Sequence, residues 1–172
     1  MTQASVSDYS HLELNCSNMM QTLNYFSDVL GMTLVSIQWA DSAKNAVRAF
    51  MRLNDRATIS FLATLRTPID IVTGVTHSKN AADNTRAGTL QHIAFNVDTV
   101  EDLLALRDRI RASGVHCLGP MDHGFCYSIY FAGPDDTALE ISTTTNDMSK
   151  WIVPSVVDYI GLTDEELERL KA

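Results

Sequence analysis

The stretch His11-Leu-Glu-Leu-Asn15 returns later in the chain as His92-Ile-Ala-Phe-Asn96, and this repeat decides the fold. Each copy begins with histidine and alternates with a period of two residues, which is typical of a strand with one buried face. Apolar residues at helical spacing follow each copy, then a glycine, Gly31 or Gly114, and then a second apolar run. Repetition on this scale predicts two copies of one structural unit, each with a histidine on its first strand.

Each unit is predicted to be a βαβββ module. The first covers residues 9–64 and the second residues 90–143, with residues 65–89 as a polar connecting loop and residues 144–172 as a tail. The helices begin after the polar caps Ser17-Asn18 and Asp98-Thr99 and end at the two glycines. Apolar runs bounded by turn residues predict strands at 9–15, 32–39, 46–53, 58–63, 90–96, 115–118, 126–132 and 138–143. The expected fold class is α+β, in one domain, and a capping box at 163–166 predicts a tail helix.

Composition narrows the function classes. A chain of 172 residues, 45% hydrophobic, is suited to a single domain. Its 21 acidic and 13 basic residues, with no basic run, argue against a nucleic acid or an anionic membrane as partner. The three cysteines lack CxxC spacing, which argues against a disulfide framework or a thiolate zinc site. The first residues lack the pattern of a signal peptide and no long apolar run occurs, so we expect a soluble, cytoplasmic protein.

Three residues form a candidate metal site. A single histidine on a strand is more often structural, but His11 and His92 hold equivalent positions in the repeat, and Glu140 lies in the closing strand at 138–143. Because side chains alternate along a strand, Glu140 points away from its apolar neighbours, toward the cavity that a closed or half-closed sheet would form. A buried carboxylate there needs a cation or hydrogen-bond donors. Two imidazoles and one carboxylate leave open positions on a divalent metal, as in non-haem Fe(II) oxygenases.

The paired βαβββ units resemble the vicinal oxygen chelate superfamily, which includes glyoxalase I, epimerases, fosfomycin and bleomycin resistance proteins and type I extradiol dioxygenases. The resemblance covers residues 9–143 and leaves the tail outside. It implies an eight-stranded, cup-shaped, half-open mixed barrel with a metal ion inside. By that resemblance His11, His92 and Glu140 would be the metal ligands.

Residues 122–140 resemble the extradiol ring-cleavage signature within this superfamily. The matching positions, in order and spacing, are His123, Ile129, Tyr130, Pro134 and Glu140. Three positions depart from the signature, namely Met121, Gly133 and Asp136; aspartate tolerates a left-handed backbone, so we expect the turn to survive.

The resemblance also implies a reaction. The substrate would be a catechol-like aromatic diol that reacts with O2 at Fe(II), with Mn(II) or another divalent metal as the alternative. His77, fifteen residues before His92, lies where this family places its acid–base histidine. Tyr130 would hydrogen-bond a substrate oxygen, and His123 would orient the substrate or Tyr130.

Other functions remain open at this point. A glyoxalase-I-like lyase or an epimerase shares the fold but usually carries a fourth ligand, a glutamate, on the strand at 58–63, where no acidic residue occurs. A fosfomycin-type thiol transferase uses three ligands, and a bleomycin-resistance-like protein binds its ligand without metal. Because many extradiol enzymes hold two such domains and this chain has one, we expect a homodimer, with the apolar tail as a candidate contact.

Overall fold

The computed structural model describes residues 9–64, 70–83, 85–144 and 152–171. Residues 65–69 and 84 of the predicted connecting loop and 145–151 of the predicted tail lie outside the described residues. The first unit contains a two-part helix and four strands: β1 (His11–Asn15), α1 (Met19–Asn24), which continues as the π-helical segment η1 (Tyr25–Val29), β2 (Thr33–Trp39), β3 (Ala46–Arg52) and β4 (Thr58–Thr64). The second unit repeats this order with β5 (Ile93–Asn96), α2 (Val100–Ala112), β6 (Cys117–Asp122), β7 (Cys126–Ala132), the 3-10 turn η2 (Pro134–Asp136) and β8 (Ala138–Thr144).

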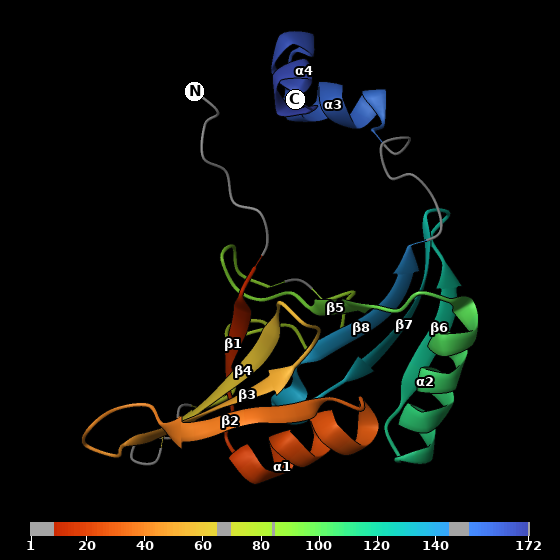
Figure 1. Ribbon diagram of the computed structural model, residues 1–172. Coiled ribbons are helices and arrows are strands. Elements are labelled where there is room, and N and C mark those ends of the chain that lie inside the picture. The colour runs from red at the N-terminus through yellow and green to blue at the C-terminus, as the bar shows by residue number, and fades with distance from the viewer. Residues whose placement is uncertain (1–8, 65–69, 84, 145–151, 172) are drawn as a thin grey trace.

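The strands form two four-stranded mixed sheets with the same topology (Figure 1). The order is β1-β4-β3-β2 in the first sheet and β5-β8-β7-β6 in the second. The first strand of each unit pairs in parallel with the last, and the other neighbours are antiparallel. The predicted α+β class and the two βαβββ units are confirmed. Within the described ranges no backbone ladder joins β1 to β5, so the eight strands form two open sheets and not a closed barrel.

The helix caps are those that the sequence predicts. The side chain of Asn18 accepts a hydrogen bond from the backbone N–H of Gln21 at 3.1 Å, and Thr99 Oγ1 accepts one from the N–H of Asp102 at 3.1 Å. Each pairing satisfies a donor that the first helical turn would leave free.

Two strands differ clearly from their predictions. The strand expected at 90–96 is observed as β5 from Ile93 to Asn96, so His92 immediately precedes it. The other was expected at 115–118, which ends before Gly119-Pro120. The observed strand β6 extends from Cys117 to Asp122 through that proline. It is the edge strand of its sheet, and its pairing with β7 shifts register between Leu118 and Met121. An edge position tolerates the missing N–H of proline, because that side of the strand has no ladder to complete.

The two units share one hydrophobic core. Phe26 from the first helix and Ile110 from the second belong to the same buried cluster, together with apolar residues of both sheets. The rings of Phe26 and Phe61 lie 4.6 Å apart between centroids. Polar contacts cross between the units as well: Tyr25 Oη donates to the carbonyl of Ala132 at 3.1 Å. The two units therefore pack against each other through a common apolar core.

The turn before β8 holds the two units together at another point. Asp135 and Asp136 both have positive φ, 56° and 58°, as the tolerance of aspartate for left-handed backbone predicts. The carboxylate of Asp135 accepts hydrogen bonds from both the backbone N–H and the hydroxyl of Ser17, which precedes α1. Asp135, the neighbour of the departing residue Asp136, thus links this turn to the first unit.

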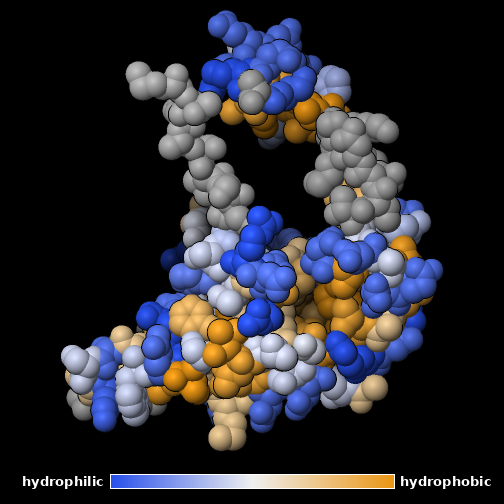
Figure 2. Space-filling view, in the orientation of Figure 1, coloured by the Kyte–Doolittle hydropathy of each residue, from blue (hydrophilic) through white to orange (hydrophobic). Residues whose placement is uncertain are grey.

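The tail contains two short helices, α3 (Pro154–Ile160) and α4 (Asp164–Lys171). The predicted capping box is confirmed: Thr163 N donates to Glu166 Oε2 at 2.9 Å, and Glu166 N donates to Thr163 Oγ1 at 3.3 Å. Figure 1 shows both helices apart from the sheets, and Figure 2 shows apolar side chains gathered on the side of these helices that faces the sheets. Among the helices described, none is long and apolar enough to cross a membrane.

Candidate metal centre and its surroundings

The polar face of the second sheet carries most of the predicted site. Leu139 and Ile141 of β8 are buried in the core, so Glu140 between them points to the opposite face. Glu140 pairs with Ala94 of β5 on one side and with Tyr130 of β7 on the other. The carboxylate therefore lies in the middle of the sheet, and the residue is only 7% exposed.

His92 lies next to this carboxylate. Its Nε2 is 2.9 Å from Glu140 Oε2, and its Nδ1 contacts Gln91 Oε1. The orientation of the Gln91 amide is fixed by its nitrogen, because Nε2 donates to the carbonyls of Ala81 at 2.8 Å and Asp83 at 3.2 Å. Since Gln91 Oε1 can only accept, His92 Nδ1 carries a proton and donates it. The second nitrogen then presents a lone pair to a carboxylate, an arrangement that needs either a proton or a cation to be stable.

This donor pair fits a divalent metal. An imidazole nitrogen and a carboxylate oxygen are ligands of Fe(II), Mn(II) and Zn(II) alike. Ligands that bind one ion at about 2.1 Å and at right angles are about 3 Å from each other, which matches the spacing of the pair. The hydrogen bond from Nδ1 to Gln91 is also the support that metal-binding histidines usually receive.

Tyr130 and His123 lie beside the pair. His123 Nε2 is 2.9 Å from Tyr130 Oη, and the rings of His92 and Tyr130 are 6.5 Å apart between centroids. Burial raises the pKa of the Tyr130 phenol, a neighbouring Ser128 lowers it, and the nearby Glu140 raises it further. The phenol therefore stays protonated at neutral pH and can donate a hydrogen bond. Four of the six predicted site residues are thus brought together.

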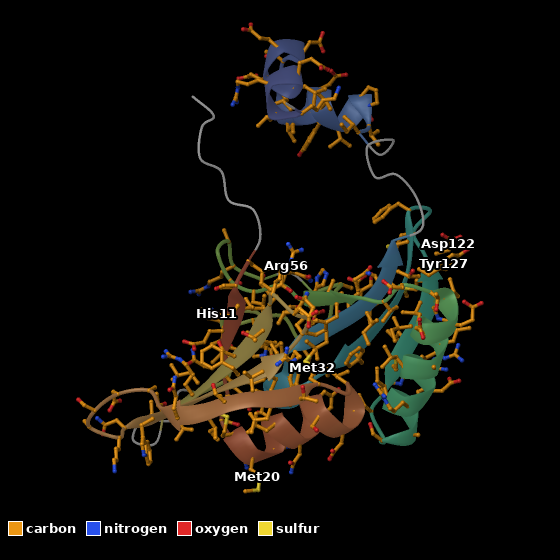
Figure 3. The ribbon with its side chains drawn as sticks, viewed as in Figure 1. His11, Met20, Met32, Arg56, Asp122 and Tyr127 are labelled. Atoms are coloured by element: carbon orange, nitrogen blue, oxygen red, sulfur yellow. The ribbon has the colours of Figure 1, made fainter. Side chains whose placement is uncertain are left out.

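His11 is placed elsewhere. It stands on the exposed side of β1 in the first sheet, with Ser10 Oγ at 3.0 Å from its Nδ1 and Phe50 at 5.7 Å between ring centroids. Figure 3 shows it on the side of β1 that is away from β5 and β8. Within the residues described, no group of three or more His, Cys, Asp or Glu side chains is placed to hold a metal. The chain alone therefore brings together two of the three predicted ligands.

His77 lies in the connecting segment, where isolated backbone bridges pair it with Thr73 and Leu90. It lines a cavity at the end of β1, together with Cys16 and Asp135, and neither His92 nor Glu140 lines that cavity. The sequence analysis assigned His77 a role from its separation of fifteen residues from His92. That separation does not determine the path of the loop between them.

Sequence reasoning missed one residue beside the pair and one further along the same face of the sheet. Gln91 holds the imidazole of His92, and Cys126 lies on the same face of β7 as Ser128 and Tyr130, with its Sγ 3.4 Å from Ser128 Oγ. The period-two spacing of Cys126, Ser128 and Tyr130 is visible in the sequence and could have indicated the shared face. No comparable signal marks Gln91, because its role depends on the path of the connecting loop.

Comparison with known proteins identifies the family of this chain. The model of the Glyoxalase/Bleomycin resistance protein/Dioxygenase superfamily matches residues 9–141. The chain belongs to this superfamily. Its members are commonly enzymes and often bind a divalent metal, so the resemblance seen in the sequence is confirmed at the level of the superfamily.

The chain is similar to two curated proteins and, in fold, to a solved structure. A probable trivalent organoarsenical cleaving enzyme of Bacillus subtilis (strain 168) is 24% identical over 143 residues, which cover 81% of this chain and 82% of the relative. Biphenyl-2,3-diol 1,2-dioxygenase 2 of Rhodococcus globerulus is 31% identical over 58 residues, or 34% of this chain and 30% of the relative. The fosfomycin resistance protein FosX of Listeria monocytogenes, solved with Mn(II) and sulfate, has a TM-score of 0.55 at 19% identity, covering 82% of this chain and 95% of that one. The structural likeness shows a shared fold.

Proposed function

We propose that this protein is a metal-dependent dioxygenase of the extradiol type, which cleaves the ring of a catechol-like aromatic diol with O2. The observation that carries the proposal is the juxtaposition of the His92–Glu140 pair with the hydrogen-bonded Tyr130–His123 pair on one face of the second sheet. A hydrolytic or isomerising metal site needs the first pair, but it does not need a protonated phenol held by an imidazole beside it.

His92, Glu140 and His11 would hold the metal, with Fe(II) as the first expectation and Mn(II) as the alternative. When bound, the metal would supply Lewis-acid polarisation of the diol oxygens and one-electron chemistry toward O2. His11 is exposed on β1 and is not with the other two, so a second copy of the chain can supply it. We therefore propose that the working site is completed in a homodimer.

The protein groups position the substrate and move protons. Tyr130 remains protonated because its pKa is raised, so its hydroxyl can donate a hydrogen bond to a substrate oxygen. His123 fixes the direction of that hydroxyl and, as an imidazole, can accept a proton from the diol and return it later. We assign the acid–base role to His123 in place of His77, because His123 is linked to this site and His77 lines a different cavity.

Anaerobic loading with Fe(II), followed by O2 and a panel of mono- and bicyclic catechols, tests the activity. We expect oxygen uptake and a coloured ring-fission product. Tyr130→Phe should keep the metal and lower kcat by about 10²-fold, the usual effect of removing one donor to a developing charge. His92→Ala should lose both metal and turnover, whereas His116→Ala, at an exposed histidine outside the site, should change neither. Absence of oxygen uptake with every diol by metal-loaded protein would favour the isomerase, lyase or transferase alternatives.

Mixing two inactive variants tests the dimeric site. His11→Ala and His92→Ala each remove one ligand, so neither variant alone should turn over. If each site takes His11 from one copy and His92 from the other, a mixed dimer keeps one complete site and regains activity. If both histidines come from one chain, the mixture stays inactive and the proposal of a shared site is wrong.

A second candidate function is cleavage of a trivalent organoarsenical, the activity named for the relative that aligns with most of this chain. The favouring observation is Cys126, a free thiol on the face that carries Tyr130 and Glu140. Thiolates are soft ligands that bind soft centres, and trivalent arsenic is one of these. Release of arsenite from an aromatic trivalent arsenical, lost in Cys126→Ser while catechol turnover is unchanged, would support this function. Equal arsenical turnover in Cys126→Ser would remove the observation that favours it.

A further inference from the structure

Two apolar side chains of β6 lie on the face of the second sheet that carries the candidate metal pair. Leu118 pairs with Tyr130 across the β6–β7 ladder. Met121 pairs with Ser128, two residues before Tyr130 on the same strand. Cross-strand partners point to the same face of a sheet, and Tyr130 is in turn the partner of Glu140. Leu118 and Met121 therefore share the face of Glu140, one strand beyond Tyr130.

Both side chains are exposed although they are apolar. Leu118 is 47% exposed and Met121 is 43% exposed. A single exposed apolar residue is ordinary, because much of any protein surface is apolar. Two of them together beside a candidate metal site need an explanation when the same positions elsewhere in the fold are polar. The first unit provides that comparison.

Polar residues stand at the equivalent positions of the first unit. Its edge strand is β2, as β6 is the edge strand of the second unit. The register, counted from the repeated histidines, puts Ser36 at the position of Leu118. The same count puts Gln38 at the position of Met121. Both β2 residues are exposed, and polar side chains suit an edge strand beside water. Of the two units, the one with the metal pair therefore carries the apolar pair.

The groups around Glu140 indicate the direction in which a bound diol extends. Tyr130, with its Oη at 2.9 Å from His123 Nε2, stands on β7, one strand from Glu140. Toward β5 the neighbour of Glu140 is Ala94, which offers no polar group, and β5 is the edge of the sheet. A diol that binds at the metal pair and accepts a hydrogen bond from Tyr130 therefore extends toward β6.

The spacing of the strands gives the reach that is needed. Glu140 lies on β8 and Leu118 on β6, with β7 between them. Two strand spacings amount to about 10 Å. A single ring that chelates the metal lies over Tyr130 on β7, and a substituent on that ring covers the remaining strand spacing.

We propose that Leu118 and Met121 form a subsite for an apolar substituent on the ring of the diol. This inference rests on the proposed function, because the diol must bind at the His92–Glu140 pair for its substituent to reach β6. The preferred substrates are then alkyl-substituted catechols, since the substituent and both side chains lose apolar surface to water on binding. The flexible thioether of Met121 adapts to the shape of the substituent. This role also accounts for Met121, which departs from the ring-cleavage signature.

A series of diols tests the preference with the full-length, Fe(II)-loaded protein in the absence of O2. Catechol, 4-methylcatechol, 4-tert-butylcatechol and 3,4-dihydroxybenzoate share the chelating group and differ in the substituent, and calorimetry gives their dissociation constants. We expect 4-tert-butylcatechol to bind about tenfold more tightly than catechol, which corresponds to the burial of about two CH2 groups. The methyl compound should lie between them, and the charged compound should bind more weakly than catechol. Equal affinity for the first three diols, or tightest binding of the charged one, would overturn the proposal.

Variants locate the preference at β6. Leu118→Ser and Met121→Gln give β6 the residues that β2 has at these positions, and both sites are exposed, so the variants should fold. The measure is the ratio of the dissociation constants of catechol and 4-tert-butylcatechol, which compares two ligands on the same metal-loaded protein. Each substitution should lower this ratio about threefold, and the two together should bring it close to one. Leu34→Ser, at a residue of β2 that is 50% exposed, is the control and should leave the ratio unchanged.

The same measurements separate this inference from the proposed function. If none of the diols binds to the metal-loaded protein, the proposed function is wrong, and the subsite is wrong with it. If catechol binds and is cleaved once O2 is admitted, but the ratio is one or survives in the double variant, the subsite alone is wrong.

Discussion

Replacing Phe26 tests whether the two βαβββ units share one core. Phe26 is 2% exposed and packs on Phe61 at 4.6 Å between ring centroids, in a cluster that includes residues of both units. Truncating a buried phenylalanine to alanine costs about 3–5 kcal/mol of unfolding free energy, and the lost aromatic pair favours the upper half of that range. For a chain of this size, the expected fall in Tm is about 6–20 °C.

Denaturation combined with amide hydrogen exchange measures the effect in each unit. In Phe26→Ala, protection should fall together in β4 of the first unit and β8 of the second, and unfolding should remain a single transition. Met20→Ala is the matched control on the same helix, because Met20 is 73% exposed and points away from the sheets in Figure 3. That variant should stay within about 0.5 kcal/mol of the original protein. Loss of protection confined to β4, or two separate transitions, would refute a shared core.

Three further predictions concern single side chains. Burial raises the pKa of the Tyr25 phenol, so the folded protein keeps a proton that the unfolded chain loses near pH 10; stability should fall as pH rises above about 10. Tyr25→Phe should flatten that decline in urea titrations and cost about 1 kcal/mol at neutral pH, where the bond to Ala132 is lost. Gly119→Ala should lower the free energy of unfolding by more than about 2 kcal/mol in thermal melts, because the new Cβ would lie 2.6 Å from the Ser128 carbonyl oxygen at a φ of +103°. Gly161→Ala, where nothing lies within 4 Å of the new Cβ, should lower it by about 1 kcal/mol. Asp135→Ala removes both hydrogen-bond acceptors of Ser17 at a residue with positive φ, so thermal melts should show a loss of about 2 kcal/mol of unfolding free energy. Asp135→Asn keeps one acceptor and tolerates this backbone, so its stability should lie closer to that of the original protein. Equal stability of the two variants would contradict this account.

The sequence predicts local structure well, because local structure depends on local patterns. The strand β7 begins and ends where the pattern places it, and Asn18 and Thr99 cap the helices as expected. The prediction failed for β6, since no local rule says that a proline stands on an edge strand. Residue periodicity also gives no information on how the helix end at Tyr25–Val29 changes from α to π geometry.

For the site, the sequence predicts which face each residue occupies but not which faces meet. Alternation in β8 places Glu140 opposite its apolar neighbours, and repetition places His92 beside it. Whether His11 joins them depends on how the two sheets are arranged, which is a matter of long-range packing. The neighbours of His77 depend in turn on the path of the connecting loop, where no period exists to guide a prediction.

The hydrogen bonds of the Gln91 side chain connect the loop before β5 to the candidate metal ligand His92. The amide nitrogen of Gln91 is held by carbonyls of residues 81 and 83, while its oxygen orients the imidazole of His92. A change in the backbone of that loop therefore rotates the ligand without touching any residue of the site. Loop grafts from relatives are then expected to alter the affinity for metal while the ligands stay the same.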